Sequence, residues 1–393
     1  MLFAVHHIDP GTIRTIADLS LLPFTDKDDL QKQNQSFICV SSEKIIDYVT
    51  TSGTLGEPVT VVMTEQDLDR LAWNECESLR CAGGSEKEIF QLMTTIDRRF
   101  MAGLAYFMGA RKLGAGVVRV GNGAPQLQWD TIARIKPTIL IAVPSFLVKL
   151  LDYASEHGID PSLSSVRKAV CIGEPIRNDD FTLNSLGKKI SEQWGIGLYS
   201  TYASTEMGAA FTECEAGRGG HYQPDLLIAE LIGEDDKPVA PGQMGELVIT
   251  TLGVEGMPLI RFRTGDLCRA HTEPCSCGRP SMRLGPILGR KKQMIKYKGT
   301  SLYPPAICNI LNEIPGVSNY LIELSTNKLG TDEVLIRVGT HLPPETIEKV
   351  LAEEFRAKLR VIPVFSFEMP ETIQREQITE MSRKPAVIID KRK

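Results

Sequence analysis

Glycines and hydroxyl side chains are concentrated in residues 50–59, "TTSGTLGEPV", directly after the apolar run "KIIDYV". Small residues let backbone N–H groups converge and hydroxyls add donors, so a loop of this kind after a strand is typical of an anion site. The sequence G-x-x-x-x-G-K-[ST] is absent, because Gly56 is followed by Glu57 and Pro58. The dinucleotide pattern G-x-G-x-x-G is absent too. An ordinary solvated turn is the alternative for this loop taken alone.

A second group of residues could bind a metal ion. Cys214 and His221 lie in "ECEAGRGGH", and Cys275 and Cys277 lie in "EPCSCGR". Together they make a Cys₃His set, which is a standard structural zinc site, because four protein ligands leave no position for water. Free thiols in a reduced protein are one alternative. A more local ligand set is another: Cys268, His271, Cys275 and Cys277.

Composition narrows the class of protein that must position these residues. The chain has 393 residues, of which 42% are hydrophobic and 24% charged, as in ordinary globular proteins of two or three domains. A net charge of −5 argues against a nucleic-acid binder. No apolar run reaches the roughly 18 residues that would span a membrane, and the start shows no signal-peptide pattern. Nine scattered cysteines favour a reducing compartment, so we expect a cytoplasmic protein.

Helical and strand-like segments alternate through the first half of the chain. The spacing predicts helices over 65–83, 128–137 and 145–158, and strands over 114–121, 138–144 and 166–173. Ser145 is suited to be an N-cap and Gly158 to end that helix. The alternation predicts an α/β fold with a largely parallel sheet. After about residue 220 strands follow one another without helices, which predicts a β-rich subdomain.

A domain boundary is expected near residues 288–304. Downstream, the patterns predict helix, strand, strand, helix and strand within about 90 residues, which indicates a small α+β domain. We therefore expect a large multi-subdomain part over 1–291 and a small domain over 292–393. The terminal "DKRK" is interpreted as a solvated tail, and no internal repeat is found.

Several short stretches together resemble a known family. "TSGTLGEP", "YASTE" (202–206), "FRTGD" (262–266) and "GRKKQMIKYKG" (289–299) match, in order, the core motifs of the adenylate-forming enzymes. The phenylacetate–CoA ligase branch is the most similar, through "TIADLSLLPFTDKDDL", "PTILIAVPSFLVKLL", "CIGEPI" and "LYPPAI". The resemblance covers nearly the whole chain, although the N-terminus looks shorter than is usual in the branch. It implies activation of a carboxylic acid by ATP and Mg²⁺ to an acyl-adenylate, followed by transfer to CoA.

The resemblance assigns roles to residues of this chain. It implies that Glu206 coordinates Mg²⁺, Tyr202 stacks on adenine, Asp266 binds both ribose hydroxyls and Arg290 contacts the ribose and phosphate region. The phosphates would be held by Thr51, Ser52, Gly53, Thr54 and Gly56. The rest of the nucleotide site would comprise Gly173, Glu174 and Pro175, which line the base, with Ala203, Ser204 and Thr205.

The last domain of the family rotates between the two half-reactions, and the matching hinge position is Lys292. The catalytic lysine of the family matches Lys384 in "SRKPAVIID", with Lys391 as the weaker candidate. Its cation would offset charge between the carboxylate and the α-phosphate. Several positions depart from the family patterns: Leu55, Lys292, Gln293, Arg383 and Val387.

The branch also bears on the metal and the substrate. Some members bind zinc through a similar Cys…His…Cys-x-Cys set, which favours Cys214, His221, Cys275 and Cys277. The branch prefers aryl acids, phenylacetate above all, and is often homodimeric. We expect the acid pocket between 98–110 and 196–204, where aromatic walls or ordinary core could be formed by Phe100, Tyr106, Phe107 and Tyr199.

Three functions are compatible with these residues. The first is an aryl-acid–CoA ligase. The second is an adenylating enzyme that loads a carrier-protein thiol or an amine, which would use the same residues with a different acceptor. The third is a non-catalytic nucleotide-binding protein, favoured by the altered positions. The small-molecule partners would be the acid, ATP and CoA, without nucleic acid or membrane.

Overall fold

A computed structural model describes Phe3 and residues 7–51, 59–298, 300–327, 331–377 and 386–392. The chain divides into two compact units, Met1–Ile287 and Leu288–Lys393. The first unit ends four residues before the boundary expected from the sequence, and a hinge at Lys292 stays a prediction. Among the described residues, no helix is both long enough and apolar enough to cross a membrane.

One half of the first unit is a parallel sheet with the strand order β4-β3-β5-β6-β7. Its strands are β3 (Ile89–Leu92), β4 (Gly116–Arg119), β5 (Ile139–Ala142), β6 (Lys168–Ile172) and β7 (Gly197–Ser204). Its helices are α3 (Glu65–Cys81), α4 (Met101–Leu113), α5 (Pro125–Ile135), α6 (Pro144–Glu156) and α7 (Ser185–Trp194). The predicted α/β alternation is confirmed.

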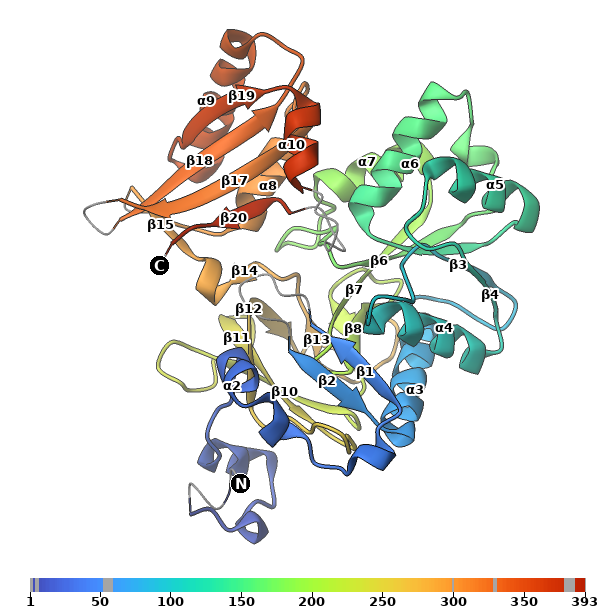
Figure 1. The fold of residues 1–393 in the computed structure, drawn as a ribbon, viewed down its shortest axis with the longest axis vertical. Helices are drawn as coiled ribbons and strands as arrows, with labels where there is room; N and C mark the ends of the chain where they lie inside the picture. The colour runs from blue at the N-terminus through green and yellow to red at the C-terminus, as the bar shows by residue number, and fades with distance from the viewer. Residues whose placement is uncertain are drawn as a thin grey trace. The chain divides into compact units, whose positions relative to one another are not determined.

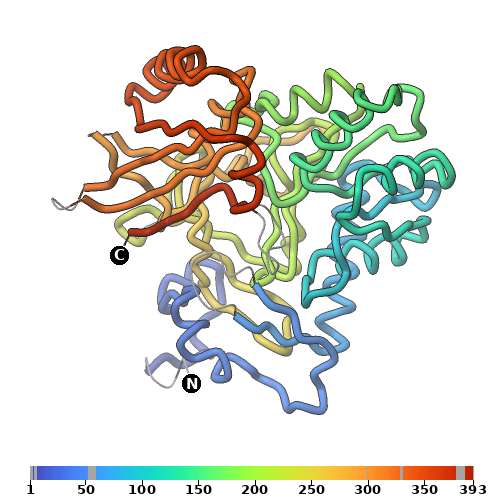
Figure 2. The backbone as a smooth tube through the Cα atoms, turned by 45° about the horizontal axis from the view of Figure 1, so that its top comes forward, coloured from blue at the N-terminus to red at the C-terminus, as the bar shows by residue number. Residues whose placement is uncertain are grey.

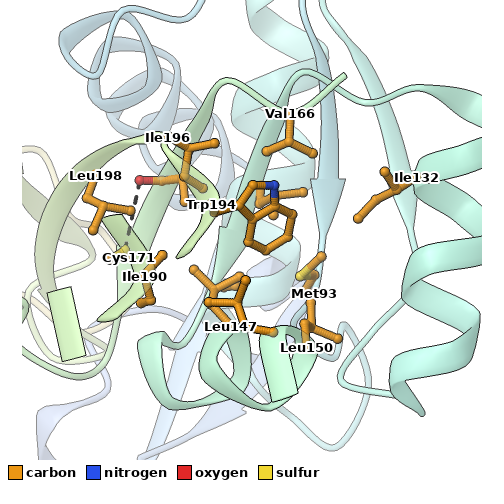
Figure 3. Packing of buried hydrophobic residues seen from close by; sticks show 14 of the residues in the cluster. Met93, Ile132, Leu147, Leu150, Val166, Cys171, Ile190, Trp194, Ile196 and Leu198 are labelled. Atoms are coloured by element: carbon orange, nitrogen blue, oxygen red, sulfur yellow. Dashed lines mark hydrogen bonds between the residues drawn. The ribbon is translucent and has the colours of Figure 1, made fainter. Parts of the chain in front are cut away.

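Helices cover both faces of this parallel sheet (Figure 1). Side chains alternate along a strand, so β5 serves two cores. Leu140 and Ala142 pack with α5, α6 and α7, in the cluster that Figure 3 shows around Trp194. Ile139 and Ile141 pack with α3 and α4 on the other face. Burial on both faces explains why these strands read as continuous apolar runs.

The sheet continues beyond β7 in antiparallel pairing, in the order β7-β8-β9-β13-β12-β11-β10. These strands are β8 (Ala209–Glu213), β9 (Gly220–His221), β10 (Leu227–Ile232), β11 (Met244–Thr251), β12 (Phe262–His271) and β13 (Arg283–Leu284). A separate hairpin, β1 (Asp47–Thr50) and β2 (Thr60–Met63), and helix α2 (Lys27–Lys32) complete the first unit. The β-rich subdomain predicted after residue 220 is present.

The second unit is built on a four-stranded sheet in the order β19-β18-β17-β20. The strands of this sheet are β17 (Asn319–Thr326), β18 (Asp332–Gly339), β19 (Val364–Glu368) and β20 (Ile388–Asp390). The unit also contains the short strands β14 (Gly289–Arg290), β15 (Ile295–Tyr297) and β16 (Thr300–Leu302). Its helices are α8 (Pro304–Glu313), α9 (Pro344–Leu359) and α10 (Pro370–Gln377). The C-terminal strand β20 runs parallel to β17, as Figure 2 shows in red beside orange.

Arg392 in the basic tail is largely buried, which corrects the sequence interpretation for this residue, whereas Lys391 is exposed. The Arg392 side chain is 14% exposed and its guanidinium pairs with Asp332 and Asp390 at 3.0 and 2.7 Å. Arg392 Nη1 also donates to the carbonyl oxygen of Met294 at 2.7 Å. Buried guanidinium groups need such partners, and the carboxylates supplying them lie far upstream or inside a strand. The charge run contains Asp390 but not Asp332, so it could not reveal the second partner.

Candidate active site

The base of the loop 52–58 is closed by two hydrogen bonds at the end of the β1–β2 hairpin. The Thr51 N–H donates to the Val59 carbonyl oxygen at 3.0 Å, and the Val59 N–H donates to Thr51 Oγ1 at 3.2 Å. Both residues are buried. The register of β1 and β2 therefore fixes where the loop begins and ends. The other phosphate-binding candidates lie outside the described residues: Ser52, Gly53, Thr54 and Gly56.

The segment Gly173–Pro175, here called the strap, follows the carboxyl end of β6. Gly173 has a φ of +73°, which glycine adopts without strain. The Glu174 carboxylate accepts the N–H and the Oγ–H of Ser145, both at 2.9 Å. The Pro175 carbonyl oxygen accepts Asn184 Nδ2 at 2.8 Å. The strap is thus tied to two neighbouring helices, and the Glu174 carboxylate is already engaged.

Ser145 is not an N-cap, so that prediction is wrong. Helix α6 begins one residue earlier, with Pro144 in its first turn and Val143 as the N-cap. Proline suits this position because its missing N–H would have no partner inside the helix. The free N–H of Ser145 is satisfied by Glu174 from a distant segment, which local sequence cannot show.

Tyr202 and Asp266 meet across the sheet. The Tyr202 hydroxyl on β7 donates to Asp266 Oδ2 on β12 at 2.6 Å. Burial, followed by the charge of Asp266, raises the pKa of Tyr202 well above its ordinary value, so the phenol stays protonated. Two motifs 64 residues apart therefore place an aromatic ring and a carboxylate side by side.

Asp266 lies in a bulge of β12. Arg263 pairs with Val248 and Leu267 pairs with Glu246, so residues 264–266 stand opposite Leu247 alone. Gly265 takes a φ of +76° there. Bulges re-aim side chains next to functional sites. The partner strand creates this bulge, so its register was not visible in the motif.

Glu206 lies in the turn Thr205–Gly208 that joins β7 to β8. Its carboxylate is half-buried and makes no hydrogen bond or ion pair with any other described part of the chain. The turn is fastened instead by Ser204, whose Oγ accepts the Met207 N–H at 3.3 Å. A half-buried, unpaired carboxylate fits a hard cation such as Mg²⁺. Ala203, at the end of the same strand, is exposed.

The remaining catalytic candidates lie in the second unit. Arg290 is exposed on β14, and Lys384 lies outside the described residues. Lys391, the weaker candidate, is paired with Glu323. Its ammonium group already has a partner, and the role of Lys384 stays a prediction.

Three of the four aromatic residues expected at the acid pocket, Tyr106, Phe107 and Tyr199, belong to or pack against one hydrophobic cluster. The Tyr199 ring lies 5.4 Å from Lys168 Nζ, at the amino end of β6, whereas the strap follows the carboxyl end. Tyr106 is a buried residue of α4 in a cluster with residues of α3, and the Phe107 ring lies under Arg119. Phe100, just before α4, is half-buried. Tyr199 is therefore core, which was the alternative stated for it.

Four metal-binding side chains come together at the antiparallel side of the sheet. The ligand atoms of Cys214, His221, Cys275 and Cys277 all lie within 4.8 Å of one another. Cys214 Sγ is 3.6 Å from Cys275 Sγ, and Cys277 Sγ is 3.4 Å from His221 Nε2. Tetrahedral zinc with Zn–S bonds of about 2.3 Å would place sulfur atoms about 3.7 Å apart. The arrangement fits the ion.

The orientation of His221 also fits. Its Nδ1 lies 3.1 Å from Ser281 Oγ, leaving Nε2 toward the cysteines. Burial lowers the pKa of His221 to about 4, so the imidazole is neutral, the form that binds metals. The competing set is not assembled, because Cys268 is buried in the hydrophobic core around Phe211. Ser281 was missed by the sequence analysis, which considered ligands alone.

A buried carboxyl group on α3 was also missed. Glu75 is 3% exposed; its Oε1 accepts Asn74 Nδ2 at 3.1 Å, and its Oε2 has no partner within the described chain. Burial raises the pKa of Glu75 to about 8. The signal was available: Leu71, Glu75 and Leu79 share one face of the helix, so an acid stands on the apolar stripe.

Comparisons with known proteins agree with this fold. The family model described as "AMP-binding enzyme" matches residues 8–256. The phenylacetate-coenzyme A ligase of Thermus thermophilus is 31% identical over 355 residues, which are 88% of this chain and 78% of the relative. That of Escherichia coli K12 is 30% identical over 84% of this chain and 75% of its own. A solved 2-hydroxyisobutyryl-CoA ligase in the postadenylation state, 22% identical, covers 99% of this chain and 84% of its own with a TM-score of 0.84, a likeness of fold.

The fold and the ordered motifs define an adenylate-forming enzyme. The chain belongs to the AMP-binding enzyme family, in its phenylacetate–CoA ligase branch. It is an AMP-forming acid–CoA ligase. A carboxylate is a poor acyl donor, so the reaction first joins it to AMP with release of pyrophosphate and then transfers the acyl group to the CoA thiol.

Proposed function

We propose that the acid is an aryl acid of the phenylacetate type. The proposal is supported by relatives named phenylacetate-coenzyme A ligase that match 82–88% of this chain. The single observation that supports the nucleotide part is the Tyr202–Asp266 hydrogen bond, which joins an aromatic side chain to a carboxylate. The partners are the acid, ATP and CoA. The compartment is the cytoplasm, and a homodimer stays a prediction.

In this proposal the residues of the sheet hold the nucleotide. The Tyr202 ring stacks on the base, and the Asp266 carboxylate accepts the ribose hydroxyls. The strap lines the base through its backbone, since the Glu174 carboxylate is engaged. The loop that starts at Thr51 holds the phosphates. Glu206 would hold Mg²⁺, which supplies charge neutralisation at the phosphates when bound.

The second unit supplies the charge at the reacting atoms. Lys384 places its ammonium group between the carboxylate and the α-phosphate and offsets the negative charge that develops there. Rotation about Lys292 would carry this lysine away for the thioester step, and Arg290 contacts the ribose and phosphate region. Each of these three roles rests on its motif.

The Cys₃His cluster is proposed to hold a structural zinc. Cys214, His221, Cys275 and Cys277 fill four positions, and no open position remains for water. Zinc would supply cross-linking of two loops that the chain does not join covalently, because all nine cysteines are free. Metal analysis of the purified protein is the direct measurement.

A pyrophosphate-release screen tests the function. The purified protein is given ATP, Mg²⁺ and single carboxylic acids, first without and then with CoA. We expect release with phenylacetate or another aryl acid, and consumption of CoA with formation of acyl-CoA. Release without CoA consumption would indicate a carrier-protein thiol or an amine as acceptor. No release with any acid would support a non-catalytic nucleotide-binding protein and contradict the proposal.

Replacement of the lysine separates the half-reactions. Lys384→Ala should lower acyl-adenylate formation by about 10²–10³-fold. Thioester formation from supplied acyl-adenylate should continue, because that step does not use this cation. Lys391→Ala is the matched control and should leave both steps within about twofold. Equal effects of the two replacements would contradict the assignment.

A further inference from the structure

We infer that Arg177 and Glu213 couple the Cys₃His cluster to the strap, so that bound metal and bound nucleotide strengthen each other. The inference rests on the proposed function, because it takes the strap as part of the nucleotide site and the cluster as a metal site. Arg177 acts as a positioning residue in it and touches neither ligand.

The two side chains form a buried ion pair. Arg177 Nε lies 2.8 and 3.0 Å from the two carboxylate oxygens of Glu213. The Arg177 side chain is 14% exposed and that of Glu213 is 4% exposed. The guanidinium also donates to the carbonyl oxygens of Phe181 and Leu198, at 3.2 and 3.4 Å. These partners together hold the guanidinium in one position, so a displacement of Glu213 would also displace Arg177.

Glu213 is the last residue of β8 and directly precedes the metal-binding Cys214. Its Oε2 also accepts the backbone N–H of Ser200 at 2.9 Å, on the strand that leads to Tyr202. One carboxylate therefore joins the start of the metal-binding loop, the strand of the nucleotide site and Arg177. A metal ion that holds Cys214 would hold this carboxylate as well.

The loop after Cys214 also lies against the guanidinium. Gly217 has a φ of +61°, and a Cβ built on it would stand 2.7 Å from Arg177 Nη2. The Gly217 N–H donates to the Cys214 carbonyl oxygen at 3.0 Å. A loop that opened on metal loss would remove this packing from Arg177.

At its other end Arg177 is joined rigidly to the strap. Only Ile176 separates it from Pro175, and Ile176 is fully buried. Asn184 fixes this stretch from the side: its N–H donates to the Ile176 carbonyl oxygen at 2.9 Å and its Nδ2 to that of Pro175 at 2.8 Å. A displaced guanidinium would have to displace the strap, because no free residue lies between them to absorb the change.

Coupling between two sites is reciprocal, so it can be measured from either side. Transfer of zinc from the full-length protein to a chromogenic chelator is followed with and without saturating AMP. AMP affinity is measured by calorimetry before and after zinc removal. We expect AMP to weaken zinc transfer at equilibrium by roughly tenfold, within the usual range of such couplings, and zinc removal to weaken AMP binding by the same factor.

Variants assign the coupling to the ion pair. Arg177→Met should bring the coupling factor close to one while zinc and AMP each still bind. Arg177→Lys, which keeps the charge, should retain an intermediate factor. The control is Arg134→Met, which removes an exposed ion pair with Asp130 and should keep the full factor.

The outcomes distinguish the coupling from the two proposals on which it rests, the metal site and the nucleotide-binding function. Zinc and AMP that both bind, with no mutual effect in the wild-type protein, would overturn the coupling alone. An unchanged factor in Arg177→Met would overturn the role of Arg177. Protein without zinc would overturn the metal site and the coupling together, whereas failure to bind AMP would overturn the proposed function. The wild-type measurement decides even if a variant does not fold.

Discussion

The nucleotide site and the Cys₃His cluster both gather residues from distant parts of the chain, but by different means. Tyr202 is paired within β7, and Asp266 lies in a bulge between paired residues of β12, so the sheet positions both whether or not a ligand is present. Cys275 and Cys277 lie in the connection between β12 and β13. Thiolates of like charge repel one another unless a cation stands between them. Ligand-site changes should therefore affect binding or rate at the first site and stability at the second.

The largest expected effect is on rate. Glu206→Gln removes the charge of the carboxylate that would hold Mg²⁺, and adenylation should fall by about 10³-fold. The free energy of unfolding should change by less than about 0.5 kcal/mol, because the turn is fastened by Ser204 instead. Pyrophosphate release and urea unfolding measure the two quantities. Glu215→Gln, at an exposed carboxylate, is the control; a similar loss in that variant would contradict the role of Glu206.

The next effect is on stability. Replacing Cys275 and Cys277 together by Ser should abolish zinc binding and lower the free energy of unfolding by about 3 kcal/mol, because metal-binding energy contributes to folding. Metal analysis and denaturant unfolding provide the measurements. Cys39→Ser changes an exposed thiol outside the cluster and should alter neither quantity. Unchanged stability in the double variant would show that the Cys₃His cluster, like the nucleotide site, does not depend on a ligand for its stability.

The buried carboxyl group of Glu75 tests how burial alone affects stability, because it belongs to neither the nucleotide site nor the metal cluster. Its folded pKa of about 8 lies above the ordinary 4.5, so between these values the folded protein keeps a proton that the unfolded chain loses. This contribution to stability is complete below about pH 4.5 and is lost as pH rises toward 8. Glu75→Gln does not titrate, so its stability relative to wild type should improve by about 2 kcal/mol between pH 5 and pH 6.5.

Urea unfolding at several pH values in this range measures the difference. The exposed Glu65, in the first turn of the same helix, supplies the control Glu65→Gln, which removes a carboxyl group that is not buried. A flat difference for Glu75→Gln would show that Glu75 is ionised in the folded protein.

The smallest effect concerns one hydroxyl. Tyr202→Phe keeps the ring but removes the donor to Asp266 and should raise the KM for ATP about fivefold, the equivalent of about 1 kcal/mol. The value of kcat should change little if base stacking is intact. Tyr222→Phe, at a half-buried tyrosine, is the control. Equal KM values for the two variants would show that the hydroxyl does not organise Asp266.

Sequence reasoning succeeded where the information was local or ordered along the chain. Strands such as Ile139–Ala142 followed from unbroken apolar runs, and the metal set followed from residue types together with the resemblance to the branch. It failed where a distant partner decided the outcome. The bulge at Asp266 depends on β11, the first turn of α6 depends on Glu174, and the buried position of Arg392 depends on Asp332. No window of sequence contains both members of these pairs.

The bulge of β12 interrupts the backbone pairing of the sheet, but it also presents a carboxylate to the site. Between Arg263 and Leu267 the strand has three residues, whereas the neighbouring strand β11 has only Leu247. A chain shortened by two residues there could pair without interruption and would gain regular backbone hydrogen bonds. It would also have a single position in which to present a carboxylate toward Tyr202. A more orderly sheet would then be a poorer enzyme.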